Sequence, residues 1–210
     1  TISGLSLDQS PRLIDGVAVQ RTKLIQGELP TPYCFSVSST LHLNPRTNFL
    51  ATQVWPSARW ASFAVQKHVE RDWKVCEFGC GPGLPALTAA SQGCSVLATD
   101  LDEFALSLVQ AAGEEQGLDV KTLRFDLIAD GLDPDQHTLQ NIHRIMGGDK
   151  IDLILFSDVF ENERVARGAA HVTKCFLQRG SRVWTFAQSD RSQREAYIAE
   201  LNQLLERNHV

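Results

Sequence analysis

The sequence has no apolar run that approaches the length of a membrane span. A spanning helix needs about 20 consecutive apolar residues, and polar or charged residues interrupt every apolar stretch of this 210-residue chain well before that length. An excess of positive charge is also missing, because 20 lysines and arginines face 25 aspartates and glutamates, a formal net charge of -5. We therefore expect neither a membrane nor a nucleic acid among the partners of this protein.

Cysteine and methionine are scarce, and their placement indicates no disulfide framework. The five cysteines are odd in number, include no Cys-x-x-Cys pair and follow no visible signal peptide. We therefore expect buried free thiols, no metal site and a location in the cytoplasm, with the nucleus as the alternative. The chain begins at Thr1 and its one methionine is Met146, so we expect the native start to lie outside this sequence.

The composition, with 43% hydrophobic and 21% charged residues, is that of a globular domain, and we expect a monomer. Short apolar runs alternate with helical patterns along most of the chain. Such alternation forms right-handed βαβ units, so it predicts an α/β, Rossmann-like fold: a mostly parallel twisted sheet with helices on both faces. The expected strands are 73–78, 94–99, 120–125, 151–156 and 181–188, and the expected helices are 57–71, 83–92, 102–116, 134–146, 164–177 and 193–207.

The first fifty residues follow a different pattern, in which prolines break short apolar runs. The runs 13–19, 23–25 and 34–37 predict short strands or hairpins. We therefore expect residues 1–52 to form an N-terminal extension that packs on a core domain over residues 53–210.

The strongest local motif is a glycine-rich loop between the first core strand and the helix that follows it. It reads Glu77-Phe-Gly79-Cys-Gly81-Pro-Gly83. Glycines let the backbone turn sharply and let a ligand approach without a Cβ in the way. The next helix presents free N–H groups and the positive end of its dipole. The motif therefore predicts a ligand site at the carboxyl ends of the parallel strands.

Two ligands fit this loop about equally when the glycines alone are considered. Residues 81–86 satisfy the dinucleotide pattern Gly-x-Gly-x-x-Ala, and Asp100 follows at the distance expected of a ribose acceptor. The same stretch fits the Glu-x-Gly-x-Gly-x-Gly loop of S-adenosylmethionine sites. The glycines therefore leave the choice between the two ligands open.

Acidic residues at the strand ends favour S-adenosylmethionine. Glu77 precedes the first glycine and suits the ammonium group of the methionine moiety. Asp126 ends the third core strand, where it can accept a hydrogen bond from the adenine amino group. Ser157 and Asp158 end the fourth strand, where a methyl acceptor would lie. A dinucleotide site needs no such series of acids.

With these residues in place, the chain resembles the class I S-adenosylmethionine-dependent methyltransferases. Within that class it is similar to the small protein-lysine methyltransferases of the methyltransferase-like 21, or nicotinamide N-methyltransferase-like, group. Three blocks carry the resemblance: the Trp-Pro segment VWPSARW (54–60), the glycine loop with its partner strand (75–90 and 96–105), and IDLILFSDVF (151–160), which is similar to the strand before the family's Asp-x-x-Tyr/Phe motif.

Two departures from the family pattern are visible. In Asp158-Val-Phe160-Glu161 the aromatic residue comes one position early. The class I sheet usually ends with an antiparallel hairpin of two further strands, whereas this chain ends at Val210, directly after the last expected helix. We therefore expect that hairpin to be absent or truncated.

The resemblance implies transfer of the sulfonium methyl group of S-adenosylmethionine to a nitrogen, with S-adenosylhomocysteine as the product. Asp158 is then expected to orient the acceptor amine, and Phe160 is expected to line the channel through which the amine enters. The implied cofactor contacts are Trp55, Glu77, Gly79, Gly81, Gly83, Asp100, Leu101, Asp126 and Ser157. The plainer alternatives are a helix cap for Asp100, a surface acid at a helix N-terminus for Glu77, a turn cap for Asp126 and a core aromatic for Trp55.

The predicted function is an S-adenosylmethionine-dependent N-methyltransferase that acts on a lysine side chain of a protein substrate. A small-molecule, nicotinamide-like N-methyltransferase is the alternative: an open acidic rim would favour the protein and a deep enclosed pocket the small molecule. A dinucleotide-dependent oxidoreductase is disfavoured, because neither Tyr33 nor Tyr197 belongs to a Tyr-x-x-x-Lys pair. The alternative from another class is a non-catalytic cofactor-binding or interaction module with the same fold.

Overall fold

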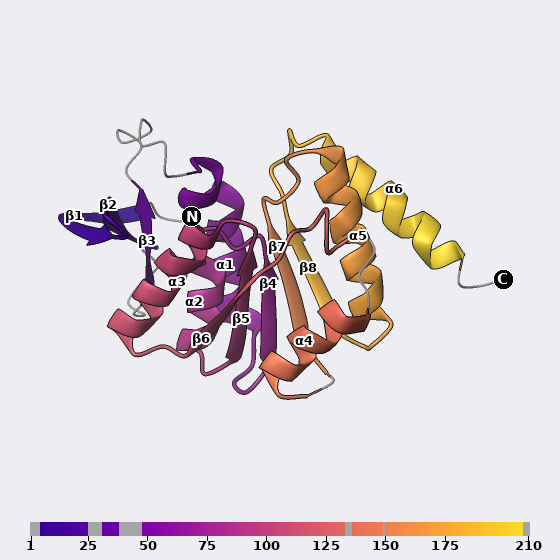
Figure 1. The fold of residues 1–210 in the computed structure, drawn as a ribbon, viewed down its shortest axis with the longest axis horizontal. Helices are drawn as coiled ribbons and strands as arrows, with labels where there is room; N and C mark the ends of the chain where they lie inside the picture. The colour runs from indigo at the N-terminus through magenta and orange to yellow at the C-terminus, as the bar shows by residue number, and fades with distance from the viewer. Residues whose placement is uncertain (1–4, 25–30, 38–47, 133–135, 149, 208–210) are drawn as a thin grey trace.

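A five-stranded parallel sheet forms the centre of the computed structural model, which describes residues 5–24, 31–37, 48–132, 136–148 and 150–207 (Figure 1). All four strand pairings are parallel. The chain starts this sheet in the middle, builds outward on one side and then crosses to the other, so the strand order reverses between β4 and β7. In spatial order the strands are β6 (Val120–Arg124), β5 (Ser95–Asp100), β4 (Lys74–Phe78), β7 (Leu153–Ser157) and β8 (Arg182–Phe186).

Helices cover both faces of the sheet, as the alternation of strands and helices predicts. Side chains on successive strand residues point to opposite faces, so Val75 packs with three helices on one face and Cys76 with helices on the other. The first face carries α1 (Pro56–His68), α2 (Leu84–Ser91) and α3 (Glu103–Gln116), and the second carries α4 (Gln136–Met146), α5 (Glu163–Leu177) and α6 (Gln193–Glu206), with α6 packed on α5. The predicted α/β fold is confirmed.

The N-terminal residues form a separate antiparallel sheet of three strands. These are β1 (Leu5–Ile14), β2 (Val17–Leu24) and β3 (Tyr33–Val37). The run 13–19 holds the turn of a hairpin, one of the two predicted options, and Asp15 and Gly16 have φ values of +49° and +78° there. Two positive φ values are typical of a two-residue hairpin turn, for which Asp-Gly is a favoured sequence. Ile25, in the predicted run 23–25, lies outside the described residues.

This small sheet lies against the outer side of α2 and α3. Buried Phe35 and Val37 share a hydrophobic cluster with residues of both helices. Gln116, at the end of α3, accepts a hydrogen bond from the N–H of Tyr33 at 2.9 Å and donates one to the carbonyl of Tyr33 at 2.8 Å. The extension is therefore held to the helical layer by a shared core and by paired hydrogen bonds.

The far edge of the central sheet is strand β8. Within the described residues, no strand follows β8 and the chain passes directly into α6. In the same part of the chain, no helix is long and apolar enough to span a membrane, and no group of three or more potential metal ligands occurs. All five cysteines are free thiols.

Candidate active site

A cavity of about 480 Å³ opens at the carboxyl ends of the parallel strands, beside the point where the strand order reverses. This is where ligands bind in open α/β sheets, and the volume suits a small organic molecule. The structure brings most of the predicted site residues together in its wall. Those that line the cavity are Trp55, Gly79, Gly81, Asp100, Leu101, Asp126, Ser157 and Asp158.

The three glycines of the loop adopt backbone conformations that other residues avoid. Gly79, Gly81 and Gly83 have φ values of +66°, +50° and +71°. A Cβ at Gly83 would lie 2.6 Å from Cγ2 of Val109 in α3. Helix packing therefore requires a glycine at position 83. The backbones of Gly79 and Gly81 line the cavity, and a Cβ at Gly79 would also lie 2.5 Å from Cγ1 of Val159.

Asp100 ties the glycine loop to the end of β5. Its Oδ2 accepts a hydrogen bond from the N–H of Gly81 at 2.8 Å, and its Oδ1 accepts one from the N–H of Asp102 at 2.9 Å. Burial raises the pKa of the Asp100 carboxyl, while these backbone hydrogen bonds oppose the shift. The helix cap that we considered for Asp100 is made instead by Asp102, which accepts from the N–H of Ala105 at 3.0 Å.

Asp126 lines the cavity just after β6, the strand that neighbours β5. Its Oδ1 accepts a hydrogen bond from the N–H of Ile128 at 2.8 Å. This is the turn cap named as its plainer alternative, and Asp126 lines the cavity as well. One carboxylate oxygen can accept more than one hydrogen bond, so the two roles are compatible.

Glu77 lies outside the lining of the cavity, fully buried between β4 and α2. Its Oε2 accepts a hydrogen bond from the N–H of Ala86 at 2.9 Å, and its Oε1 accepts one from Oγ of Ser157 at 3.2 Å. Burial raises the pKa of Glu77 to about 8, which these hydrogen bonds only partly offset. Glu77 is thus an acid at the N-terminus of a helix, but a buried one, and it joins β7 to α2 beneath the glycine loop.

Asp158 has an unusual backbone conformation and a buried side chain. Its φ is +60°, in a region that aspartate tolerates better than most residues, and its side chain is 1% exposed. Gln188 donates a hydrogen bond from Nε2 to Oδ2 of Asp158 at 2.7 Å. The other oxygen, Oδ1, lies 3.4 Å from Nε of Arg191, and no described residue donates a hydrogen bond to it.

The structure places Phe160 in the core and not in the wall of the cavity, which differs from our expectation. Phe160 is 1% exposed and its ring centre lies 5.0 Å from that of Tyr197 in α6. Its neighbours Val159 and Glu161 line the cavity. The backbone turns Phe160 toward the core, so the position three residues after Asp158 presents an acid where the family motif has an aromatic residue.

The rim of the cavity combines apolar and acidic side chains. Leu50 and Leu101 are 41% and 50% exposed, and both line the opening. Trp55 donates from Nε1 to the carbonyl of Leu50 at 2.8 Å, which fixes its ring beside them. Of the described residues that line the cavity, five are acidic and one is basic: Asp100, Asp102, Asp126, Asp158 and Glu161 against Arg124.

Comparison with known proteins agrees with this geometry. Residues 38–204, well over half of the chain, match the family model described as lysine methyltransferase. The chain belongs to the lysine methyltransferase family. The resemblance that its motifs predict is therefore confirmed.

Curated relatives of this lysine methyltransferase family member match over a shorter segment. The ribosomal protein L11 methyltransferases of Thermotoga neapolitana and Thermotoga maritima are 30% identical to it over 89 and 91 residues. These segments cover 42% and 43% of this chain and 33% and 34% of those proteins. The match therefore spans about a third of the length of these relatives.

Two solved structures share the fold. The TehB-like SAM-dependent methyltransferase of Corynebacterium glutamicum has a TM-score of 0.52 at 18% identity, covering 69% of this chain and 71% of that chain. The T. thermophilus 16S rRNA N2 G1207 methyltransferase, in complex with AdoMet and guanosine, has a TM-score of 0.53 at 15% identity, covering 94% of this chain and 46% of that chain. The fold that the chain shares with both structures agrees with its family.

The residues of this methyltransferase fit S-adenosylmethionine better than a dinucleotide. S-adenosylmethionine carries a sulfonium cation, an ammonium group and hydroxyl donors, all of which favour carboxylates. A pyrophosphate is an anion, and the excess of acidic side chains around the cavity would repel it. The choice that the glycine pattern left open is therefore decided by the charges around the loop.

The packing of the glycine loop leads to a stability prediction. Gly83→Ala should lower the free energy of unfolding by about 2 kcal/mol or more, because a Cβ in the left-handed region costs about 1–2 kcal/mol and Val109 must also move. Gly117→Ala is the matched control, since Gly117 has φ +66° and a Cβ added there would meet no heavy atom within 4 Å. Urea unfolding of both variants checks this, and an equal loss in the two would show that Val109 adds no constraint.

Proposed function

We propose that this chain transfers the methyl group of S-adenosylmethionine to the side-chain amine of a lysine in a protein substrate. The observation that carries the proposal is Asp158, which lines the cavity and whose buried Oδ1 lies 3.4 Å from Nε of Arg191 and receives no hydrogen bond from a described residue. Buried acceptors normally have a donor, so an N–H of the substrate is the natural partner for this atom.

Some side chains of the cavity hold the cofactor, and others orient the acceptor amine. S-adenosylmethionine supplies an electrophilic methyl group on a positively charged sulfur. Asp100 holds the glycine loop and keeps lone pairs for the ribose hydroxyls. Asp126 faces the same space and can accept from the adenine amino group. Asp158 directs the amine through Oδ1, so that the acceptor nitrogen is aligned with the methyl group, and such alignment is a major source of rate enhancement.

The bond changes of the transfer need no strong base in the protein. The lone pair of the uncharged amine forms the new N–C bond while the C–S bond breaks, and the electron pair of that bond stays on sulfur. The methylated nitrogen then carries the positive charge and loses a proton to water. The chain must therefore align the amine and hold it uncharged.

The rim supports a protein acceptor over a small molecule. The exposed side chains of Leu50 and Leu101 give apolar contact area around the opening, and Glu161 adds negative charge beside it. The aliphatic stem of a lysine could pack on the apolar area, and basic neighbours in the peptide could pair with the negative charge. A small substrate would need a closed site, and the cavity here is open enough to expose half of Leu101.

Calorimetry and methyl transfer test the proposed function together. We expect S-adenosylhomocysteine to bind and NAD not to bind, and we expect the labelled methyl group to appear on lysine in proteins of a cell lysate. Asp100→Asn should weaken S-adenosylhomocysteine binding about tenfold or more, because hydrogen bonds to a charged group contribute about 1.5–3 kcal/mol. Label on a small amine and on no protein would favour the small-molecule alternative, and binding of NAD would contradict the cofactor assignment.

A further inference from the structure

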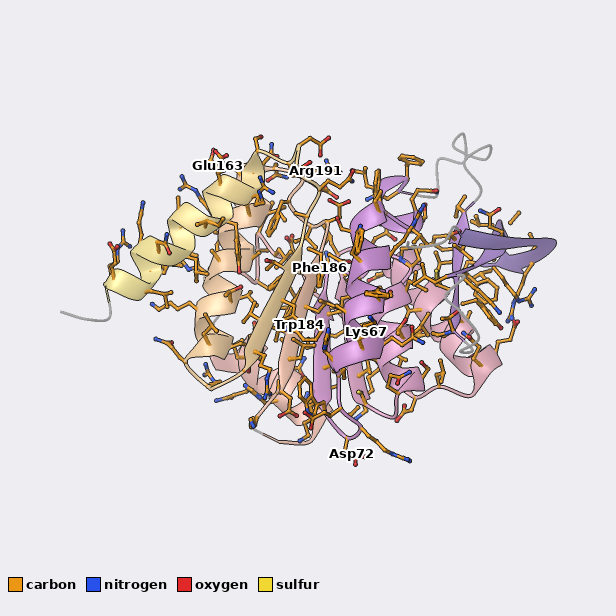
Figure 2. The ribbon with its side chains drawn as sticks, turned by 180° about the vertical axis from the view of Figure 1, so that it is seen from behind. Lys67, Asp72, Glu163, Trp184, Phe186 and Arg191 are labelled. Carbon is orange, nitrogen blue, oxygen red and sulfur yellow. The ribbon has the colours of Figure 1, made fainter. Side chains whose placement is uncertain are left out.

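Arg191 reaches the acceptor side of the cavity from a segment that the glycine-loop motif does not include. It follows β8 in the turn before α6, where its backbone N–H donates to the carbonyl of Gln188 at 3.2 Å. Figure 2 shows Arg191 at the end of the sheet opposite to Asp72, which precedes β4, so it lies at the carboxyl ends of the strands. Its side chain is 30% exposed and does not itself line the cavity.

The guanidinium group of Arg191 lies between an aromatic ring and two acids. Its Nε is 3.4 Å from Oδ1 of Asp158, and its central carbon is 5.8 Å from the centre of the Trp55 ring. The positive charge of Arg191 also acts on Glu161, three residues after Asp158. Burial and the charge of Asp100 raise the pKa of Glu161, and the charge of Arg191 opposes this rise. The cation therefore acts on both acids of the β7–α5 loop.

The remaining charged groups of the cavity lie on other elements. Asp100 ends β5 and Asp102 follows it, while Arg124 ends β6 and Asp126 follows it. Gln188, which also contacts Asp158, is uncharged. Arg191 is thus the one described cation in an ion pair with Asp158.

We propose that Arg191 is a positioning residue that keeps the acceptor amine uncharged by compensating the charge of Asp158. The inference rests on the proposed transfer to lysine. In water a lysine amine has a pKa of about 10.4 and is a cation at neutral pH, whereas only the uncharged form has the lone pair that attacks. A lone carboxylate beside the amine would stabilise the ammonium and raise its pKa by about 1–3 units.

Arg191 shifts the equilibrium between the ammonium and the uncharged amine while leaving Oδ1 of Asp158 in place as the hydrogen-bond acceptor. Asp158 lines the cavity, and no described residue donates a hydrogen bond to its buried Oδ1, so this oxygen keeps its lone pairs for an N–H of the amine. The neighbouring guanidinium repels a second cation, so the ammonium is favoured less. The proton of the entering ammonium leaves to water at the open rim, and the freed lone pair forms the N–C bond as the C–S bond breaks with its electrons left on sulfur.

Two variants separate the charge of Arg191 from its shape. Arg191→Gln removes the cation and Arg191→Lys keeps it. The assay measures initial rates of methyl transfer between about pH 6.5 and pH 10, with a lysine peptide from a lysate protein that the unchanged enzyme labels. We expect Arg191→Gln to move the pH of half-maximal rate upward by about one unit or more, with a rate about tenfold lower at neutral pH and near-normal at the alkaline end. Arg191→Lys should stay close to the unchanged enzyme.

The outcomes distinguish this inference from the function on which it rests. S-adenosylhomocysteine affinity is the control for an intact cofactor site and should be unchanged in Arg191→Gln, whereas its urea midpoint should fall because the buried Asp158 carboxylate loses its cation. Labelled lysine together with an unshifted profile of Arg191→Gln would overturn the role of Arg191 and leave the proposed function standing. Equal profiles for Arg191→Gln and Arg191→Lys would overturn it as well. Cofactor binding without label on lysine would overturn the proposed function, and the inference with it.

Discussion

Replacement of Asp158 by asparagine should reduce methyl transfer by about 10- to 100-fold or more at neutral pH, with S-adenosylhomocysteine affinity nearly intact. Asparagine keeps the size of the side chain and tolerates the φ of +60° at this position. It also keeps an oxygen for Gln188, which donates to Oδ2 of Asp158. What it loses is the charge on the atom that faces the amine, and a hydrogen bond to a charged partner contributes about 1.5–3 kcal/mol.

Alanine at the same position should abolish transfer, because it removes the acceptor atom altogether. The matched control is Asp119→Asn, which neutralises an exposed acid just before β6, far from the cavity lining. Rates come from labelled methyl transfer and affinity from calorimetry on the same preparations. Unchanged turnover of Asp158→Asn would reject the orienting role, and loss of S-adenosylhomocysteine binding would assign Asp158 to the cofactor site instead.

The elements of the core domain could be predicted because their patterns are local. The strand before the glycine loop and the strand that ends at Asp100 are short apolar runs that stop at a glycine or an acid. Both appear within about a residue of the predicted bounds, and their parallel pairing follows from the helices between them. The Asp15-Gly16 turn could also have been located, since a residue pair of this type inside an apolar run is a hairpin signal.

The finer geometry of the site depends on contacts between distant parts of the chain. Whether Phe160 or Glu161 faces the cavity is decided by Tyr197, which lies in the last helix and packs against the Phe160 ring. Arg191 carries no motif, and its pairing with Asp158 exists only because β8 returns beside β7. The burial of Glu77 depends likewise on the helix that follows it. Each of these contacts depends on how the chain folds, so the spacing of residues along the sequence does not predict it.

The buried Glu77 should give this protein a stability that falls as the pH rises. Its pKa in the folded state is about 8, above the 4.5 of a free glutamate, because burial disfavours the charged form. Between these values the unfolded chain has released the proton and the folded chain still holds it, so each pH unit lowers the free energy of unfolding by up to about 1.4 kcal/mol. The contribution is complete below the unfolded pKa and is lost as the pH approaches the folded pKa.

Glu77→Gln isolates this effect. The amide oxygen can still accept from the N–H of Ala86, and the amide group can donate to the hydroxyl of Ser157, so the contacts between β4, α2 and β7 survive. Relative to the unchanged protein, the variant should gain several kcal/mol in free energy of unfolding between about pH 5 and pH 8 and little beyond. Urea unfolding across this range measures the difference, with Glu206→Gln on the exposed side of α6 as the control. A difference that stays constant with pH would mean that Glu77 ionises in the folded protein as it does in the unfolded chain, and that its burial against α2 is not maintained in solution.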